Sequence, residues 1–146
     1  MPDLYDIDFY AWTQTQAAAL AAGHMGELDL ANLAEEIESL GKRDRRGLGS
    51  ALEIVLAHLL KWGYQPERRG VSWEDSLDEH RNRIADIVAD SPSLRRQIPD
   101  LLDRGYTRAR RAAARQTRLP LATFPESCPW TPEQVLDEDF LPEATP

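Results

Sequence analysis

The sequence predicts an all-α protein, an antiparallel up-and-down bundle of four main helices with an irregular, proline-rich C-terminal strap and a short final helix. Apolar residues recur three and four positions apart over long stretches, which is the period of a helix with one buried face. No segment alternates apolar and polar residues as a half-buried strand would. The length of 146 residues is typical of one domain, so we expect residues 1–146 to form a single domain.

The first predicted helix is rich in alanine and lies near the N-terminus. Asp6 or Asp8 is positioned to cap its start, because a carboxylate there accepts hydrogen bonds from free backbone N–H groups. Gly23 follows Ala22 and is the type of residue that ends a helix.

The second predicted helix is the longest. Asp29 is positioned to cap it, and the helix reaches about Trp62. Glycines interrupt its middle, so the sequence leaves open whether the helix over residues 29–63 is continuous or broken between Gly41 and Gly49. Its apolar stripe consists of Leu33, Ile37, Leu40, Leu48, Leu52, Val55, Leu56 and Leu59.

Two further helices follow. Ser72 and Asp75 have the spacing of a capping box, which predicts the start of a third helix that ends at Asp90. A fourth helical stretch covers residues 92–117. We expect a kink or a restart at Pro99, because proline inside a helix removes a backbone hydrogen bond.

The remaining residues, 119–146, are expected to form a strap packed on the bundle. Thr131, Pro132 and Gln134 have the pattern of a helix cap, a first-turn proline and a capping-box partner. A short final helix is therefore predicted to run from this cap to about Asp139.

The charge and the cysteine content narrow the class of protein. The net charge of -8 favours a soluble protein that nucleic acid and anionic membranes repel on average. No run approaches the roughly 20 apolar residues of a membrane-spanning helix, and the acidic N-terminus lacks the features of a secretory signal. Cys128 is the single cysteine, which excludes an internal disulfide. We therefore expect a cytoplasmic protein with no membrane span.

Two histidines are the candidates for a metal site or a cryptic active site. His58 and His80 lie on consecutive predicted helices at broadly similar heights, where a carboxylate from another helix would complete the site. The sequence contains no Glu-x-x-His pair and no zinc or nucleotide-binding motif. A hydrogen-bonded core histidine and a histidine at the edge of the core explain the pattern without a metal and are the favoured interpretation, and we assign no cofactor.

A row of arginines is the clearest charge feature. Spacings of four, three, four and three residues place all five on one helix face, which is able to grip the phosphates of nucleic acid. The first forty-one residues carry eight acidic side chains and no Lys or Arg, so pairing within the molecule is the favoured alternative and nucleic acid the less favoured partner. The row consists of Arg104, Arg108, Arg111, Arg115 and Arg118.

The end of the long helix is the candidate site for a protein partner. Trp62, Tyr64, Arg68 and Arg69 are of the residue types enriched at the centres of protein interfaces. For this turn alone, the favoured interpretation is that the aromatic residues close the end of the core.

No catalytic residue is assigned, because no serine lies in a G-x-S-x-G turn and Cys128 has no histidine near it in sequence. Our leading hypothesis is a non-enzymatic helical module that binds another protein, or a second copy of itself, through this turn or an exposed bundle face. A metal protein or enzyme using His58 and His80 is the alternative, and nucleic-acid binding is a further one.

Four strings resemble a known family. They are DFYAWT at residues 8–13, EEIESLG at 35–41, HLLKW at 58–62 followed by YQPERR, and FPESCPWT at 124–131. They span nearly the whole chain and are similar to the bacterial domain-of-unknown-function family twenty-nine. The resemblance implies a helical bundle in a bacterial cytoplasm, and it implies no activity, substrate or catalytic residue.

Overall fold

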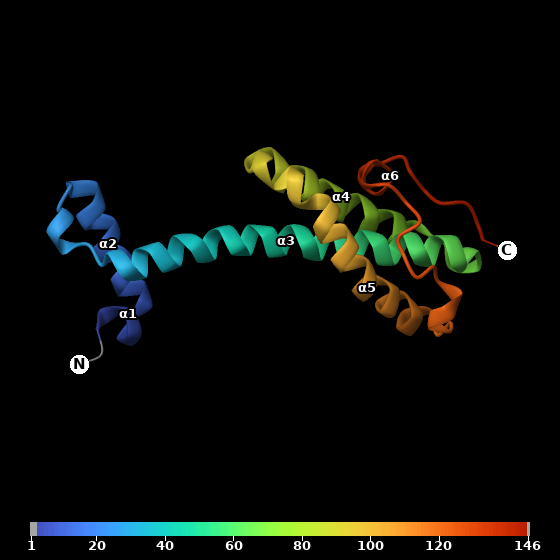
Figure 1. The fold of residues 1–146 in the computed structure, drawn as a ribbon, viewed down its shortest axis with the longest axis horizontal. Coiled ribbons are helices and arrows are strands. Elements are labelled where there is room, and N and C mark those ends of the chain that lie inside the picture. Colours follow the sequence, from blue (N-terminus) through green and yellow to red (C-terminus); the bar gives the residue numbers. More distant parts are fainter. Residues whose placement is uncertain (1–2, 146) are drawn as a thin grey trace. The chain divides into compact units, whose positions relative to one another are not determined.

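The computed structural model describes residues 3–145 and contains no strand within them, which confirms the all-α class. Its internal contacts divide the chain into two compact units, Met1–Arg43 and Asp44–Pro146. Helix α3, Leu30–Tyr64, contributes residues to both units and is one unbroken helix of 35 residues (Figure 1). The helix is therefore continuous between Gly41 and Gly49. The expected single domain stays a prediction.

The N-terminal unit is formed by short helices followed by the first turns of α3. Its elements are α1 (Leu4–Ile7), α2 (Phe9–Ala22) and the 3-10 turn η1 (Met25–Glu27). The carboxylate of Asp8 accepts a hydrogen bond from the backbone N–H of Ala11 at 3.0 Å, which confirms the predicted cap of α2. The helix ends at Gly23, whose φ of 74° lies in the left-handed region that glycine adopts without strain.

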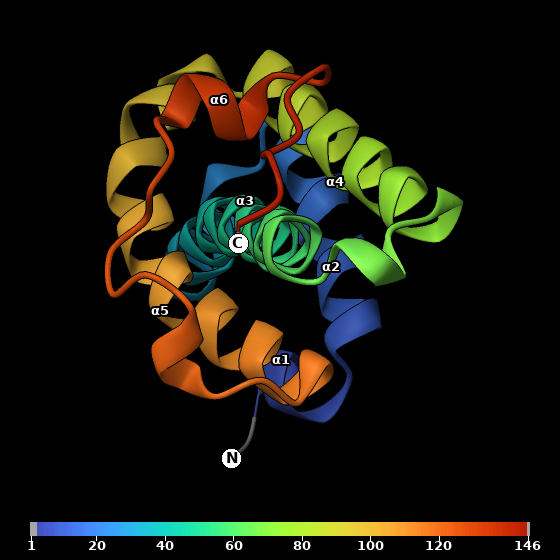
Figure 2. The ribbon, with the colours of Figure 1, turned by 90° about the vertical axis from the view of Figure 1, so that its right-hand side faces the viewer.

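The C-terminal unit packs helices around the second half of α3. Its elements are α4 (Val71–Asp90), α5 (Ile98–Thr117), α6 (Pro132–Leu136) and the 3-10 turns η2 (Pro66–Arg68), η3 (Pro92–Gln97) and η4 (Leu121–Thr123). Figure 2, which looks along α3, shows α4 and α5 on different sides of this helix. The apolar stripe of this half of α3 is completely buried, as predicted, at Leu48, Leu52, Val55, Leu56 and Leu59.

Local capping signals were partly correct. The predicted capping box of Ser72 and Asp75 is wrong, because α4 already begins at Val71, after Gly70, and no side chain caps it. The restart near Pro99 is confirmed, since η3 ends at Gln97 and α5 then begins with this proline in its first turn.

The strap after α5 is held by side chains of the helices below it. Arg81 of α4 donates to the carbonyl oxygen of Val135 at 2.9 Å, and Arg110 of α5 donates to that of Phe124 at 3.1 Å from Nε. The hydroxyl of Tyr106 donates to the carbonyl oxygen of Pro125 at 2.6 Å. These bonds satisfy backbone groups that an irregular segment cannot pair with itself.

The short helix in the strap begins as predicted and ends earlier. Thr131 and Gln134 form the predicted capping box in both directions. The helix α6 closes at Leu136 rather than near Asp139.

Candidate functional site

The aromatic turn after α3 is engaged in contacts within the C-terminal unit. Trp62 is 8% exposed, and the guanidinium of Arg69 lies over its ring at 5.0 Å and donates from Nε to its carbonyl oxygen at 2.8 Å. Tyr64 packs edge-on against the ring of Phe124, with 5.1 Å between the ring centres. Of the four predicted contact residues, Arg68 is the exposed one. A role of this turn in partner binding stays a prediction.

The two histidines bond to their own helices. Nδ1 of His58 lies 2.9 Å from the carbonyl oxygen of Ile54, and Nδ1 of His80 lies 2.7 Å from that of Ser76. A carbonyl oxygen only accepts, so each Nδ1 carries the hydrogen and each neutral ring keeps its lone pair on Nε2. Burial lowers the pKa of His58, and the nearby charges of Lys61 and His80 add to this effect.

In the described part of the chain, these histidines have no third metal-ligating side chain beside them. Among residues 3–145, no three His, Cys, Asp or Glu side chains lie close enough together to hold a metal ion. The metal site at His58 and His80 stays a prediction.

All five arginines of the predicted row are exposed. Four of them lie on α5, whereas Arg118 is the residue after its end, with a φ of 59°, so the predicted helix face does not include it. Nε of Arg104 lies 3.4 Å from a carboxylate oxygen of Asp100, one turn earlier. Within the part of the chain that the structure describes, Arg108, Arg111, Arg115 and Arg118 form no ion pair. Pairing of this face with the acidic N-terminal residues stays a prediction, and so does nucleic-acid binding.

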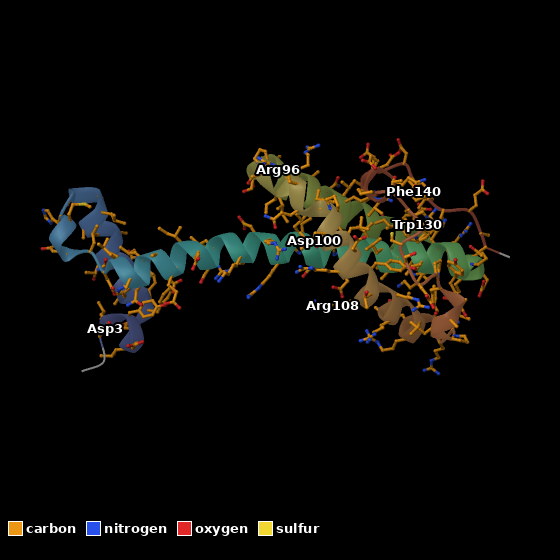
Figure 3. All side chains as sticks on the ribbon, in the orientation of Figure 1. Asp3, Arg96, Asp100, Arg108, Trp130 and Phe140 are labelled. Atoms are coloured by element: carbon orange, nitrogen blue, oxygen red, sulfur yellow. The ribbon has the colours of Figure 1, made fainter. Side chains whose placement is uncertain are left out.

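Sequence reasoning missed a groove in the C-terminal unit where α3 and α5 meet. Arg45 and Arg46 of α3 line it together with Arg104 and Arg108 of α5, around a volume of about 730 Å³. Figure 3 shows Asp100 and Arg108 on the part of α5 that lies over α3. The spacing of arginines within one helix indicated only the α5 side, because about sixty residues separate the two contributions.

The N-terminal unit has a small interior. Its buried residues are Trp12, Gln16 and Ala19, and the rings of Tyr5 and Phe9 pack around Trp12. This interior rests on polar contacts to the start of α3. The indole N–H of Trp12 donates to the carboxylate of Asp29 at 3.0 Å, and the amide of Gln16 accepts from the backbone N–H of Asp29 at 2.7 Å.

Hydrogen bonds shift the pKa values of two ionisable groups in this unit. The hydroxyl of Tyr5 donates to Glu36, and this bond is the main reason why its pKa is raised to about 12. The side chain of Asn32 donates to the carboxylate of Asp29 at 2.7 Å, which lowers the pKa of that carboxyl group. The first bond joins α1 to α3, and the second joins the first turn of α3 to Asp29, the residue that precedes this helix.

Large apolar side chains are exposed over this same unit. The stripe of α3 that was expected to pack in the bundle is not covered here, because Ile37 is 67% exposed and Leu40 is 56% exposed. That expectation is therefore corrected for the N-terminal turns of α3. The exposed large apolar residues of the unit are Leu4, Ile7, Phe9, Tyr10, Leu20, Met25, Leu30, Ile37 and Leu40.

The fold and these surfaces define a small all-α protein with a helical core, a basic groove and an apolar, acidic N-terminal unit. Residues 4–141 match the family described as Domain of unknown function DUF29, and the chain belongs to this family. No curated protein and no solved structure matches the chain. In residues 3–145, no helix has the length and apolar character needed to cross a membrane. The cytoplasmic location stays a prediction.

Proposed function

We propose that this chain is a protein-interaction module and that its N-terminal unit is the surface that binds the partner. The supporting observation is the distribution of exposed apolar side chains. Of the twelve large apolar residues exposed in the described part of the chain, nine belong to the N-terminal unit. Contiguous exposed apolar surface is costly in water and commonly marks a binding site. The proposal therefore moves the contact surface away from the Trp62 to Arg69 turn.

The start of α3 supplies a linear binding edge. Leu30, Leu33, Ile37 and Leu40 are spaced three, four and three residues apart, as in the seam of a coiled coil. Leu33 is half-buried, and the other three are exposed by 56 to 67%. A partner helix with apolar residues at matching intervals is able to cover this seam.

The charge of the unit defines the chemistry of the partner. Eight acidic side chains and no Lys or Arg occur in the first forty-one residues, and Glu35 and Glu38 are exposed beside the seam. A complementary partner carries Lys or Arg at the edges of its apolar stripe, because charges of opposite sign favour encounter and fix the register.

A second copy of the chain fits this surface less well. Its own N-terminal unit has the same negative charge, and like charges facing each other destabilise an interface. The described residues of its C-terminal unit expose three large apolar side chains, Val71, Leu121 and Leu141. These three are too few to cover the nine exposed apolar side chains of an N-terminal unit. The surface therefore favours a different, basic protein.

The experiment that tests this function compares three baits at endogenous level in the native host. The wild-type chain, the double variant Ile37→Ser with Leu40→Ser, and the control Val71→Ser are each captured with nuclease present. Val71 is 70% exposed in the C-terminal unit, so the control removes a similar apolar side chain from another surface. Proteins retained by wild type and control but lost from the double variant are then purified.

Binding of the purified partner is measured by calorimetry at low and high salt. The proposal predicts a loss of at least tenfold in affinity for the double variant, no change for the control, and weaker binding at high salt. Circular dichroism verifies that the double variant keeps its helix content. Equal binding by all three chains would refute the site. If the wild type forms concentration-dependent dimers and the double variant does not, the partner is a second copy of this chain and not a different protein.

A further inference from the structure

The groove between α3 and α5 has the size of a ligand site. Its volume of about 730 Å³ lies within the range of roughly 300–1,000 Å³ that holds small molecules in proteins. It belongs entirely to the C-terminal unit. The lining residues are Arg45, Arg46, Gly49, Ser50, Glu53, Leu101, Arg104, Gly105, Thr107 and Arg108.

Positive charge collects in this groove although the whole chain is acidic. One carboxylate, Glu53, lines it together with the four arginines. Arg45 and Arg104 share Asp100, at 3.6 Å and 3.4 Å from its carboxylate. Two carboxylates therefore face four guanidinium groups, which leaves the groove with a net positive charge on a chain of net charge -8.

Two of the guanidinium groups are available to a ligand. Within residues 3–145, neither Arg46 nor Arg108 forms an ion pair or a hydrogen bond from its side chain, and both are exposed. They come from different helices, so their positions across the groove depend on the packing of α3 against α5. Each presents a planar fork of N–H donors that matches the oxygens of a phosphate group.

Two glycines also line the groove. A Cβ added at Gly49 would lie 3.6 Å from Leu101, and one added at Gly105 would lie 3.9 Å from Glu53. Both are ordinary contact distances, so the packing of the helices accepts alanine at either position. Glycine weakens the interior of a helix relative to alanine. Gly105 is buried where α5 contacts Glu53 of α3, and the half-buried Gly49 adds no side chain to the lining of the groove.

The remaining lining residues define the class of ligand. Ser50 and Thr107 add hydroxyl groups, and Leu101 is the one large apolar residue of the lining. No aromatic side chain lines the groove, whereas sites for single-stranded nucleic acid depend on aromatic stacking. We propose that this groove binds a small, multiply charged phosphate compound, held by Arg46 and Arg108 with Arg45 and Arg104 beside them.

The test uses inorganic tripolyphosphate as the probe, with orthophosphate as the weaker anion. Calorimetry on the full chain at low salt is expected to give saturable binding of one tripolyphosphate and markedly weaker binding of orthophosphate. Arg46→Gln and Arg108→Gln should each weaken the affinity at least tenfold. Arg111→Gln is the matched control, because Arg111 is exposed on the same helix outside the groove, and it should change the affinity less than twofold.

A fourth variant separates binding from stability. Gly49→Ala should raise the melting temperature and still weaken tripolyphosphate binding, a combination that general loss of structure does not produce. Three results would overturn the proposal. They are no saturable binding at low salt, equal weakening by Arg111→Gln, or tighter binding of a single-stranded oligonucleotide that depends on Arg111 and Arg115. The last result would assign the arginine row to nucleic acid instead.

Discussion

Arg81 and Phe140 are joined by a hydrogen bond of 3.0 Å from guanidinium Nη2 to the carbonyl oxygen, across 59 positions of the sequence. The same side chain reaches Val135 through Nε. Arg81 is 4% exposed, and burial is the main cause that lowers its pKa. One buried cation therefore fastens the last turn of α6, and the chain that follows it, to α4.

Replacing this arginine should loosen the strap. Arg81→Met keeps much of the apolar stem but leaves two carbonyl groups without their donor, so we expect a loss of about 2–4 kcal/mol in the free energy of unfolding. Urea unfolding measures the change. Arg83→Met, at an exposed position of the same helix, is the control and should change stability by less than about 0.5 kcal/mol. Comparable losses of stability in both variants would contradict this role of Arg81.

The two halves of α3 should respond differently to the same substitution. Leu56→Ala removes a completely buried side chain and should cost about 2–5 kcal/mol, because it leaves a cavity in the core. Leu40→Ala removes a side chain that is 56% exposed and should stay within about 0.5 kcal/mol. Thermal or urea unfolding of the isolated chain measures the change in stability of each variant. A large loss for Leu40→Ala would mean that its surface is already covered in solution.

Acid should destabilise the protein partly through His58. Burial lowers the pKa of this ring in the folded state, so the unfolded chain takes up the proton at a higher pH than the folded chain does. Stability must then fall as the pH decreases from the ordinary histidine pKa to the folded value. The group is surrounded by Lys61, His80 and the carbonyl of Ile54, and the two side-chain charges act in the same direction.

The measurement is the melting temperature at about pH 7 and about pH 5. His58→Gln does not titrate and keeps an N–H donor for Ile54, so the decrease between the two pH values should be smaller in this variant than in the wild type. An identical decrease would exclude His58 as a source of the acid sensitivity.

Asp29 should make the N-terminal unit sensitive to acid in a lower pH range than the one in which His58 acts. Hydrogen bonds from Asn32 and Trp12 lower the pKa of its carboxyl group. The stabilisation is therefore complete above the ordinary aspartate pKa and is lost as the pH falls through the folded value. The protection factors of the backbone amides of residues 9–22, which correct for the intrinsic pH dependence of exchange, should fall on acidification, and Asp29→Leu should show this lower protection already at neutral pH. Unchanged protection in the variant would contradict the role of Asp29.

Local signals in the sequence correctly predicted most helix boundaries. Asp8, Gly23 and Thr131 act on backbone groups within three or four positions of themselves, so their effect is visible in a short string. The pattern at Ser72 failed because the chain had already entered α4 at Val71. A capping pattern indicates that a helix start is chemically possible, and the surrounding fold selects which residue is used.

The groove shows why the sites were harder to predict. Arg104 and Arg108 could be found from their spacing, since both lie on one helix. Their neighbours Arg45 and Arg46 lie on another helix, and no pattern along the chain connects the two pairs. The groove becomes visible only when the crossing of α3 and α5 is known.

Periodicity, caps and composition were enough to establish from the sequence that the chain is helical, about where its longest helical stretch begins and ends, and that its first forty-one residues are acidic. The folded chain was needed to learn which apolar faces are covered. Leu40 and Leu56 belong to one stripe on one helix, yet the first is exposed and the second is completely buried. The physical reason is that periodicity is a property of a single segment, whereas burial requires a second segment to pack against it.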